Sequence, residues 1–235
     1  MLRFHQKHGA HVELSKCSTI ATRKKSFANA VVFSHRPLST LETFMFEIIE
    51  HEQGWSGHVR CGITSHNPKD FQLRVPPYLL PDLAQMGKTW VFAIKPNNSK
   101  PLGDEHLRDD GSYNFQRVEE GDEDTNQLFC GEKAAMQNVK PTDKGSRIGL
   151  RINSSGDLYF FVNGKKFGPC ATNVPTINAY AAVDVYGSTK SVRIVQCGVP
   201  TLLNLCCNEI KIATKNKSMK DLPIPKLLIK YISSF

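Results

Sequence analysis

Residues 147–166 read RIGLRINSSGDLYFFVNGKK, and this stretch decides the fold class. Apolar residues recur at every second position in two short runs, a period that is typical of β-strands with one buried face. The segment 154–157 between the runs contains Ser, Gly and Asp, which predicts a hairpin turn. Asn163-Gly164 ends the second run and tolerates positive φ, so we expect another tight hairpin there. The alternating residues are Ile148, Leu150 and Ile152, then Leu158, Phe160 and Val162.

The same alternation recurs over residues 41–195. Turn-forming residues separate the runs, and many short strands with turns between them predict an all-β domain, either a sandwich or a barrel. We expect each strand to bury one face and to expose the other. The further runs are Phe44, Phe46 and Ile48; Val59, Cys61 and Ile63; Trp90, Phe92 and Ile94; and Ala181, Val183 and Val185.

The pattern changes at residues 198–200, where Pro200 precedes an apolar segment. Pro is favoured in the first turn of a helix, and the residues that follow are spaced as in a helix. Apolar residues four apart form one stripe, and a second stripe lies beside it. The stripes hold Leu202, Cys206 and Ile210 in the first and Leu203 and Cys207 in the second, and Leu205 adds apolar surface.

A basic polar linker follows, and Leu222-Pro223-Ile224-Pro225 then opens a second helix with apolar residues at i, i+3, i+4 and i+7. A tail of this length is too short to build a core of its own. Its apolar faces therefore indicate a partner protein. We divide the chain into a β domain over residues 1–197 and a small α-helical box over residues 198–235.

Composition limits the classes of function. The chain has 235 residues and a formal net charge of +8, with its basic residues concentrated before Pro37 and after Pro200. The segment 104–124 is strongly acidic, and we expect it to form an exposed loop. No nucleic-acid-binding motif accompanies the basic residues, so a solvated surface is favoured over a nucleic-acid partner. No apolar run approaches the ~18 residues of a transmembrane helix.

The cysteines and the N-terminus bear on location. No apolar segment follows Met1, so we expect no secretory signal. The seven cysteines are odd in number and lack paired metal-ligand spacing, which favours buried free thiols in a cytoplasmic protein without a bound metal or cofactor. They are Cys17, Cys61, Cys130, Cys170, Cys197, Cys206 and Cys207.

The C-terminal segment resembles a suppressor-of-cytokine-signalling box. The elongin-binding part of such a box has a small residue, then Leu, Cys and an aliphatic residue at intervals of one, four and four. Thr201, Leu202, Cys206 and Ile210 match it. The cullin-selecting part has Leu-Pro-aliphatic-Pro, which residues 222–225 match in the form associated with cullin-5.

The rest of the chain resembles a neuralized homology repeat over about residues 4–196. The resembling stretches are Phe4-His5-Gln6-Lys7-His8-Gly9, Ala21-Thr22-Arg23, Ser26-Phe27, Val32-Phe33-Ser34, Arg36-Pro37-Leu38, Gly54-Trp55-Ser56-Gly57-His58, Leu79-Leu80-Pro81-Asp82-Leu83 and Asp184-Val185-Tyr186-Gly187. Such repeats are antiparallel β-sandwiches similar to SPRY domains, and they bind protein targets. No Cys/His series with the paired spacing of a RING finger is present.

The two resemblances together imply a non-catalytic adaptor of a ubiquitin ligase. The β domain would recruit an unknown target protein, and the box would bind elongin B/C and cullin-5 with its RING subunit. The elongin-binding residues would be Leu202, Leu203, Leu205, Cys206 and Ile210. The cullin-binding residues would be Leu222, Pro223, Ile224 and Pro225.

We expect the target site on loops at one end of the sandwich, at residues 34–37 and 54–58, because strands supply a frame while loops carry recognition. Arg36 is suited to carboxylates, Trp55 to an apolar pocket, and His58 lies beside it. Trp55 could equally pack as a lid on the core.

Metal-binding and catalytic functions fit the sequence less well. His5, His8 and His11 are spaced by three, but a metal site is not favoured because carboxylate or Cys ligands are lacking apart from Glu13. Cys61, His58 and Asp70 could form a triad on paper, but no nucleophile-elbow sequence surrounds them. A scaffold outside any ligase stays open, as does a membrane-surface protein that uses Arg23-Lys24-Lys25 and the C-terminal lysines.

Overall fold

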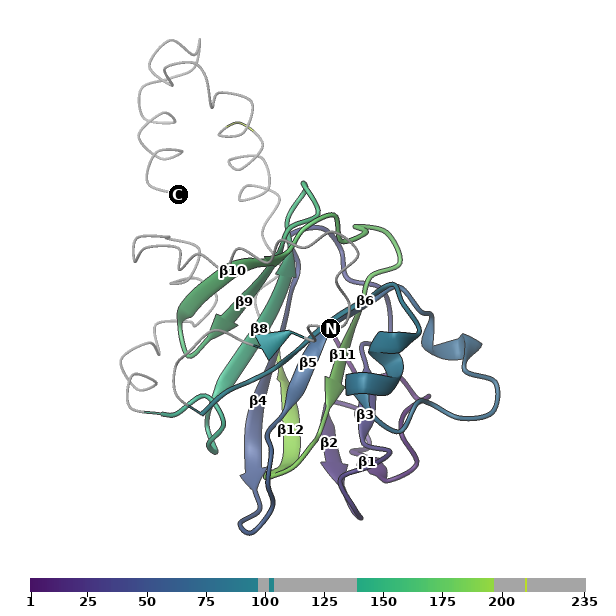
Figure 1. Cartoon of the computed structure of the whole chain (residues 1–235), viewed down its shortest axis with the longest axis vertical. Coiled ribbons are helices and arrows are strands. Elements are labelled where there is room, and N and C mark those ends of the chain that lie inside the picture. The colour runs from purple at the N-terminus through teal and green to yellow at the C-terminus, as the bar shows by residue number, and fades with distance from the viewer. Residues whose placement is uncertain (97–101, 104–138, 197–209, 211–235) are drawn as a thin grey trace.

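The chain forms two antiparallel β-sheets that face each other (Figure 1). A computed structural model describes residues 1–96, 102–103, 139–196 and 210. The strands in these ranges pair antiparallel in two separate sheets, neither of which closes on itself, and this arrangement confirms the sandwich over the barrel that the alternation left open. The predicted helical box lies outside the described residues, apart from Ile210, which is helical and partly buried.

The larger sheet has seven strands. In spatial order they are β1 (Val12–Leu14), β2 (Ile20–Arg23), β12 (Thr189–Val195), β4 (Thr43–His51), β8 (Arg147–Ile152), β9 (Leu158–Val162) and β10 (Lys165–Ala171). The smaller sheet has five, namely β3 (Val31–Phe33), β11 (Tyr180–Asp184), β5 (Arg60–Thr64), β6 (Thr89–Ala93) and β7 (Leu102–Gly103).

Both predicted hairpins are present. The side-chain oxygen of Asn153 accepts hydrogen bonds from the backbone N–H groups of Ser155 and Asp157, and these bonds close the turn between β8 and β9. Between β9 and β10, Asn163 and Gly164 have φ of 48° and 81°. Two successive positive φ values match the twist of the flanking strands, which is why Asn-Gly is favoured there.

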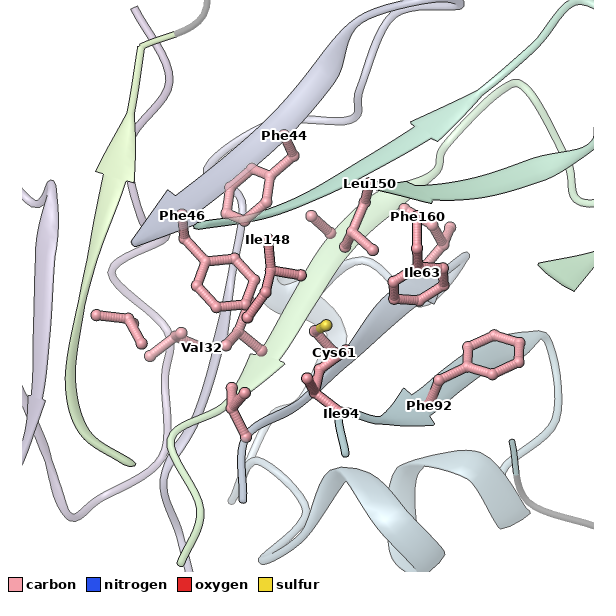
Figure 2. Close-up of a cluster of buried hydrophobic side chains, with 14 of the residues drawn as sticks. Val32, Phe44, Phe46, Cys61, Ile63, Phe92, Ile94, Ile148, Leu150 and Phe160 are labelled. Carbon is pink, nitrogen blue, oxygen red and sulfur yellow. The ribbon is translucent and has the colours of Figure 1, made fainter. Parts of the chain in front are cut away.

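The core lies between the two sheets (Figure 2). Phe44, Phe46 and Leu150 from the larger sheet face Cys61 and Ile63 from the smaller one. Phe92 and Phe160 meet across the interface edge to face, with ring centroids 5.1 Å apart. The alternating runs therefore supply the core, as the period of two predicts.

The expectation of one buried face per strand is wrong for the centre of the smaller sheet. All five residues of β11 are buried. The connection between β5 and β6 folds over the outer face of this sheet and contains the short helices η1 (Pro68–Asp70) and η2 (Leu79–Leu83). Its buried apolar side chains cover the outward-facing residues of β3, β11 and β6, so the outer face of the smaller sheet is also shielded from water. The residues of this second cluster are Val31, Phe33, Phe71, Val75, Leu79, Leu83, Ala84, Val91 and Ala182.

The cysteine expectation is only partly correct. Cys17, Cys61 and Cys170 are free thiols within the described ranges. Cys61 and Cys170 are buried, but Cys17 is exposed in the β1–β2 turn, where it contacts two hydroxyl groups. Those contacts lower the pKa of the Cys17 thiol to about 7. The other four cysteines lie outside the described residues.

Candidate functional site

The two loops that were expected to share one end of the sandwich lie at opposite ends. β3 and β5 are both antiparallel to β11 and therefore run parallel to each other. Asp184, at the end of β11, pairs with Arg60 at the start of β5, so residues 54–58 lie beyond that end. β3 leaves the sheet at the other end, where the Leu38 N–H donates to the Ala179 carbonyl. Arg36 therefore lies far from Trp55.

Arg36 is already paired inside the protein. Its guanidinium contacts both carboxylate oxygens of Glu42, at 2.7 and 2.6 Å. Burial would raise the pKa of Glu42, but hydrogen bonds from Arg36 and the Ser39 N–H outweigh it and lower that pKa. The hydrogen bonds with Glu42 also raise the pKa of Arg36. A bidentate pair of this kind stabilises the loop after β3, and Glu42 competes with any target carboxylate for Arg36.

Trp55 belongs to a group of four partly exposed rings that we call the aromatic cluster: Phe27, Trp55, Tyr78 and Tyr186. Phe27 lies at the centre, with ring centroids 5.4 Å from Trp55, 5.6 Å from Tyr186 and 6.5 Å from Tyr78. Tyr78 and Tyr186 are 6.1 Å apart. The rings come from four segments that are distant in sequence: the β2–β3, β4–β5, β5–β6 and β11–β12 connections.

Trp55 does not act as a lid on the core. It belongs to none of the buried apolar clusters of the described residues. Its neighbours are the Phe27 ring and the guanidinium of Arg23, which lies 4.9 Å from the centroid of the indole. The geometry therefore favours the surface interpretation of Trp55 over the core interpretation.

Gly57 and Gly187 let the loop of Trp55 and the loop of Tyr186 approach each other closely. A Cβ on Gly57 would lie 2.5 Å from Cε1 of Tyr186, and one on Gly187 would lie 2.2 Å from the Gly57 carbonyl oxygen. The Ser188 N–H donates to the same carbonyl at 3.0 Å. His58 Nδ1 lies 2.9 Å from the Ser188 hydroxyl, so His58 joins the two loops from inside. Its burial lowers its pKa.

A layer of charge lies beneath the rings. Arg23 is 1% exposed and donates to the Gly187 and Thr189 carbonyls at 2.6 and 3.3 Å. Burial lowers the pKa of Arg23, and Glu52 and Asp184 oppose that effect. Asp184 is fully buried, and one of its oxygens accepts from the Leu79 N–H at 3.0 Å. Burial raises the pKa of Asp184 to about 7, against the opposing effects of Leu79, Arg60 and Arg23.

The surroundings of Cys61 and of the three N-terminal histidines do not suit a nucleophile or a metal site. Cys61 is fully buried in the core, and burial raises the pKa of its thiol, so it is not a competent nucleophile. His8 and His11 contact the backbone carbonyls of Gly9 and Ala28, and the Lys7 N–H donates to His5. Across the part of the chain that the structure describes, no three potential ligands gather to hold a metal ion.

The predicted docking residues for elongin and cullin lie outside the described residues, apart from Ile210. These are Leu202, Leu203, Leu205 and Cys206 for elongin, and Leu222, Pro223, Ile224 and Pro225 for cullin. The acidic loop that was expected over 104–124 lies outside them as well. In the described ranges no helix is long and apolar enough to cross a membrane.

Comparison with known proteins identifies the β domain. The sequence profile described as Neuralized matches residues 4–196. The chain belongs to the Neuralized family. This Neuralized chain is 36% identical over 235 residues to mouse neuralized-like protein 2, across 87% of the chain and 81% of that protein. A shorter stretch of 105 residues is 36% identical to human E3 ubiquitin-protein ligase NEURL3, across 44% of this chain and 40% of that one.

A solved structure supports the fold of this Neuralized domain. The crystal structure of the NHR1 domain of Drosophila melanogaster neuralized superposes with a TM-score of 0.59 at 22% identity, covering 83% of this chain and 98% of that one. At this level of identity the likeness establishes the fold alone. The antiparallel sandwich that the resemblance to neuralized repeats implied is therefore supported by this solved structure.

Sequence reasoning found Trp55 but missed Phe27 and Tyr78 as site residues, and it used Tyr186 only as part of a family motif. An aromatic residue in a polar basic turn, as at Phe27, was an available signal, because Gly, Pro, Asn, Asp and Ser dominate turns. Nothing local indicated that Phe27 and Tyr186 would touch, since they are 159 positions apart in the sequence.

Proposed function

We propose that this chain is the target-recognition adaptor of an elongin B/C–cullin-5-type ubiquitin ligase. The Neuralized domain holds a target protein, and the segment 198–235 docks the ligase machinery. The chain supplies no catalytic group, and its place of action is the cytoplasm. One observation carries the proposal: a Neuralized domain over 4–196 is followed directly by an elongin-type motif and a cullin-type motif in the right order.

The family supports a role in ubiquitination. A relative that shares 36% identity over part of this chain is named an E3 ubiquitin-protein ligase. The geometry of the described residues supports binding, because loops of the sandwich gather four partly exposed rings into one group. Adaptors act through proximity, raising the effective concentration of target lysines near the ubiquitin thioester.

Each motif would have its own contact. Leu202 would anchor in a pocket of elongin C, where burying a Leu contributes about 1.5–3 kcal/mol. Cys206 would pack beside it as a small apolar group, and Ile210 would extend the stripe. Pro223 and Pro225 would fix the direction of the chain that enters the cullin-facing helix.

The experiment is a purified-protein titration of the full chain with elongin B/C and then with cullin-5. Leu202→Ala with Cys206→Ala should abolish elongin binding, because both changes remove apolar anchors from one stripe. The matched control is Asn204→Ala with Asn208→Ala, which changes the same predicted helix off both stripes and should bind normally. Unchanged elongin affinity in the Leu202/Cys206 variant would refute the docking proposal.

A second pair of changes separates the two motifs. Pro223→Ala with Pro225→Ala should weaken cullin-5 recruitment and leave elongin binding intact, since the two motifs lie in different predicted helices. Equal loss of both partners would show instead that these prolines serve folding of the box.

The membrane-surface alternative is not favoured by the geometry. Of the triplet Arg23-Lys24-Lys25, Arg23 is buried, and Lys24 forms an ion pair with Glu13 at 3.0 Å. The triplet therefore does not present three free cations to a lipid surface.

A further inference from the structure

The aromatic cluster differs from the other apolar surface of the molecule. Large exposed apolar side chains in the described residues include Leu73, Met86 and Ile177, which are aliphatic and come from separate connections. Single exposed apolar residues are ordinary on protein surfaces. Phe27 is 37% exposed and instead lies within 7 Å of three further rings. A contiguous patch of this kind marks an interface.

The cluster is held in place before anything binds. The Asn29 N–H donates to the Pro77 carbonyl at 2.7 Å, which ties the loop of Phe27 to the loop of Tyr78. Ser188 and Gly57 tie the loops of Tyr186 and Trp55 in the same way. Little conformational entropy is therefore lost when a partner binds to these rings.

Arg60 supplies a positive charge beside the aromatic cluster. Its guanidinium stacks on the ring of Tyr186 at 3.8 Å and donates one hydrogen bond, to the Leu80 carbonyl at 2.6 Å. The ion pairs within the described ranges do not include Arg60 or the exposed Lys25. A stacked guanidinium with unused N–H groups presents a planar fork that suits a carboxylate.

The rings do not suit a cationic ligand. Guanidinium groups already lie on the faces of Trp55 and Tyr186, at 4.9 and 3.8 Å. A ligand ammonium would meet like charge at the ring faces that a cation would otherwise occupy. The complementary ligand therefore combines apolar surface with negative charge.

Unpaired buried polar atoms gather under the same rings. Within the described residues, four buried side-chain atoms lack a hydrogen-bond partner, and three of them are Arg23 Nε, Asp184 Oδ1 and Thr189 Oγ1. Arg23 touches both Trp55 and Thr189, so these atoms lie beneath the cluster rather than elsewhere in the core. Unpaired buried polar atoms are uncommon in native proteins, so their concentration under the rings sets this part of the described core apart from the rest.

We propose that the aromatic cluster is the docking site for an extended segment of a partner protein in which a large apolar side chain neighbours an Asp or Glu. The apolar side chain packs on Phe27 and Trp55, and the carboxylate pairs with Arg60 beside Tyr186. The assignment of this segment to a ubiquitination target rests on the proposed function above. The binding itself does not require the ligase.

The test is selection of a random peptide library on the immobilised full chain, followed by affinity measurement of the selected peptides. The selected sequences should place an aromatic or large aliphatic residue next to Asp or Glu. Phe27→Ser should weaken their binding at least about tenfold, a loss that corresponds to about 1.4 kcal/mol. The matched control is Leu73→Ser, the same change at a residue that is 94% exposed and outside the cluster, and it should bind like the wild type.

A double-mutant cycle tests the charge. Arg60→Gln should weaken the acidic peptide about tenfold, and the same peptide with Asp→Asn or Glu→Gln should bind wild type and Arg60→Gln equally. The proposal would be overturned if the library yielded basic peptides or no peptides. It would also be overturned if Phe27→Ser bound the selected peptides normally, or if the double-mutant cycle showed no coupling between Arg60 and the peptide carboxylate. Elongin binding is measured on the same wild-type preparation. A wild-type chain that binds elongin but selects no apolar–acidic peptide refutes this site alone, and one that binds the peptides but not elongin refutes the ligase proposal alone.

Discussion

Replacing Trp55 by Ala distinguishes a surface role from a core role through its effect on stability. The lost contacts are an edge-to-face pair with Phe27, about 0.5–1.5 kcal/mol, and a cation–π contact with Arg23, about 0.5–1 kcal/mol when partly exposed. No sealed cavity forms, because water reaches a partly exposed position, and Arg23 regains some hydration. We therefore expect the free energy of unfolding to fall by about 1–2.5 kcal/mol.

The assay is urea unfolding of the full chain, with peptide affinity measured in parallel. The control is Phe160→Ala, since Phe160 is fully buried at the centre of the core and its loss should cost about 3–5 kcal/mol. Trp55→Ala should also remove binding of the selected peptides. If Trp55→Ala costs as much as Phe160→Ala, or if it leaves peptide binding unchanged, the surface assignment of Trp55 is refuted.

Two further predictions concern the layer beneath the rings. Burial raises the pKa of Asp184 from 3.8 to about 7, so between these pH values the folded state holds a proton that the unfolded state releases. The stability of the wild type relative to Asp184→Asn should therefore fall as the pH rises from about 4 to about 7. The expected fall is up to about 4 kcal/mol. Parallel stability curves from urea unfolding at each pH would contradict this. Gly57→Ala should lower stability by more than Gly54→Ala, because both have φ near +85° but only a Cβ at Gly57 meets the Tyr186 ring. Equal losses in thermal unfolding would show that the contact between the Gly57 and Tyr186 loops is not stabilising.

The candidate site could be predicted only in part. Trp55 stood out because a Trp between glycines in a turn is unusual, and it does lie in the cluster. The expected pairing of its loop with residues 34–37 was wrong, because strand order places the two loops at opposite ends of β11. Arg36 looked free for a target carboxylate, yet Glu42, only six residues away, occupies it. A short loop can fold back on itself in ways that residue type alone does not reveal.

The sequence by itself determined the strands and hairpins of this protein. A period of two assigns side chains to the faces of a strand, and Asn-Gly prefers positive φ, so both signals are local. Local signals also carry the two docking motifs at 201–210 and 222–225, which stay predictions. The tertiary structure alone decided that β11 lies between β3 and β5 and that β12 lies between β2 and β4. That order brings residues 27, 55, 78 and 186 together, and it follows from packing between segments that are distant in sequence, which the periodicity within any one segment does not encode.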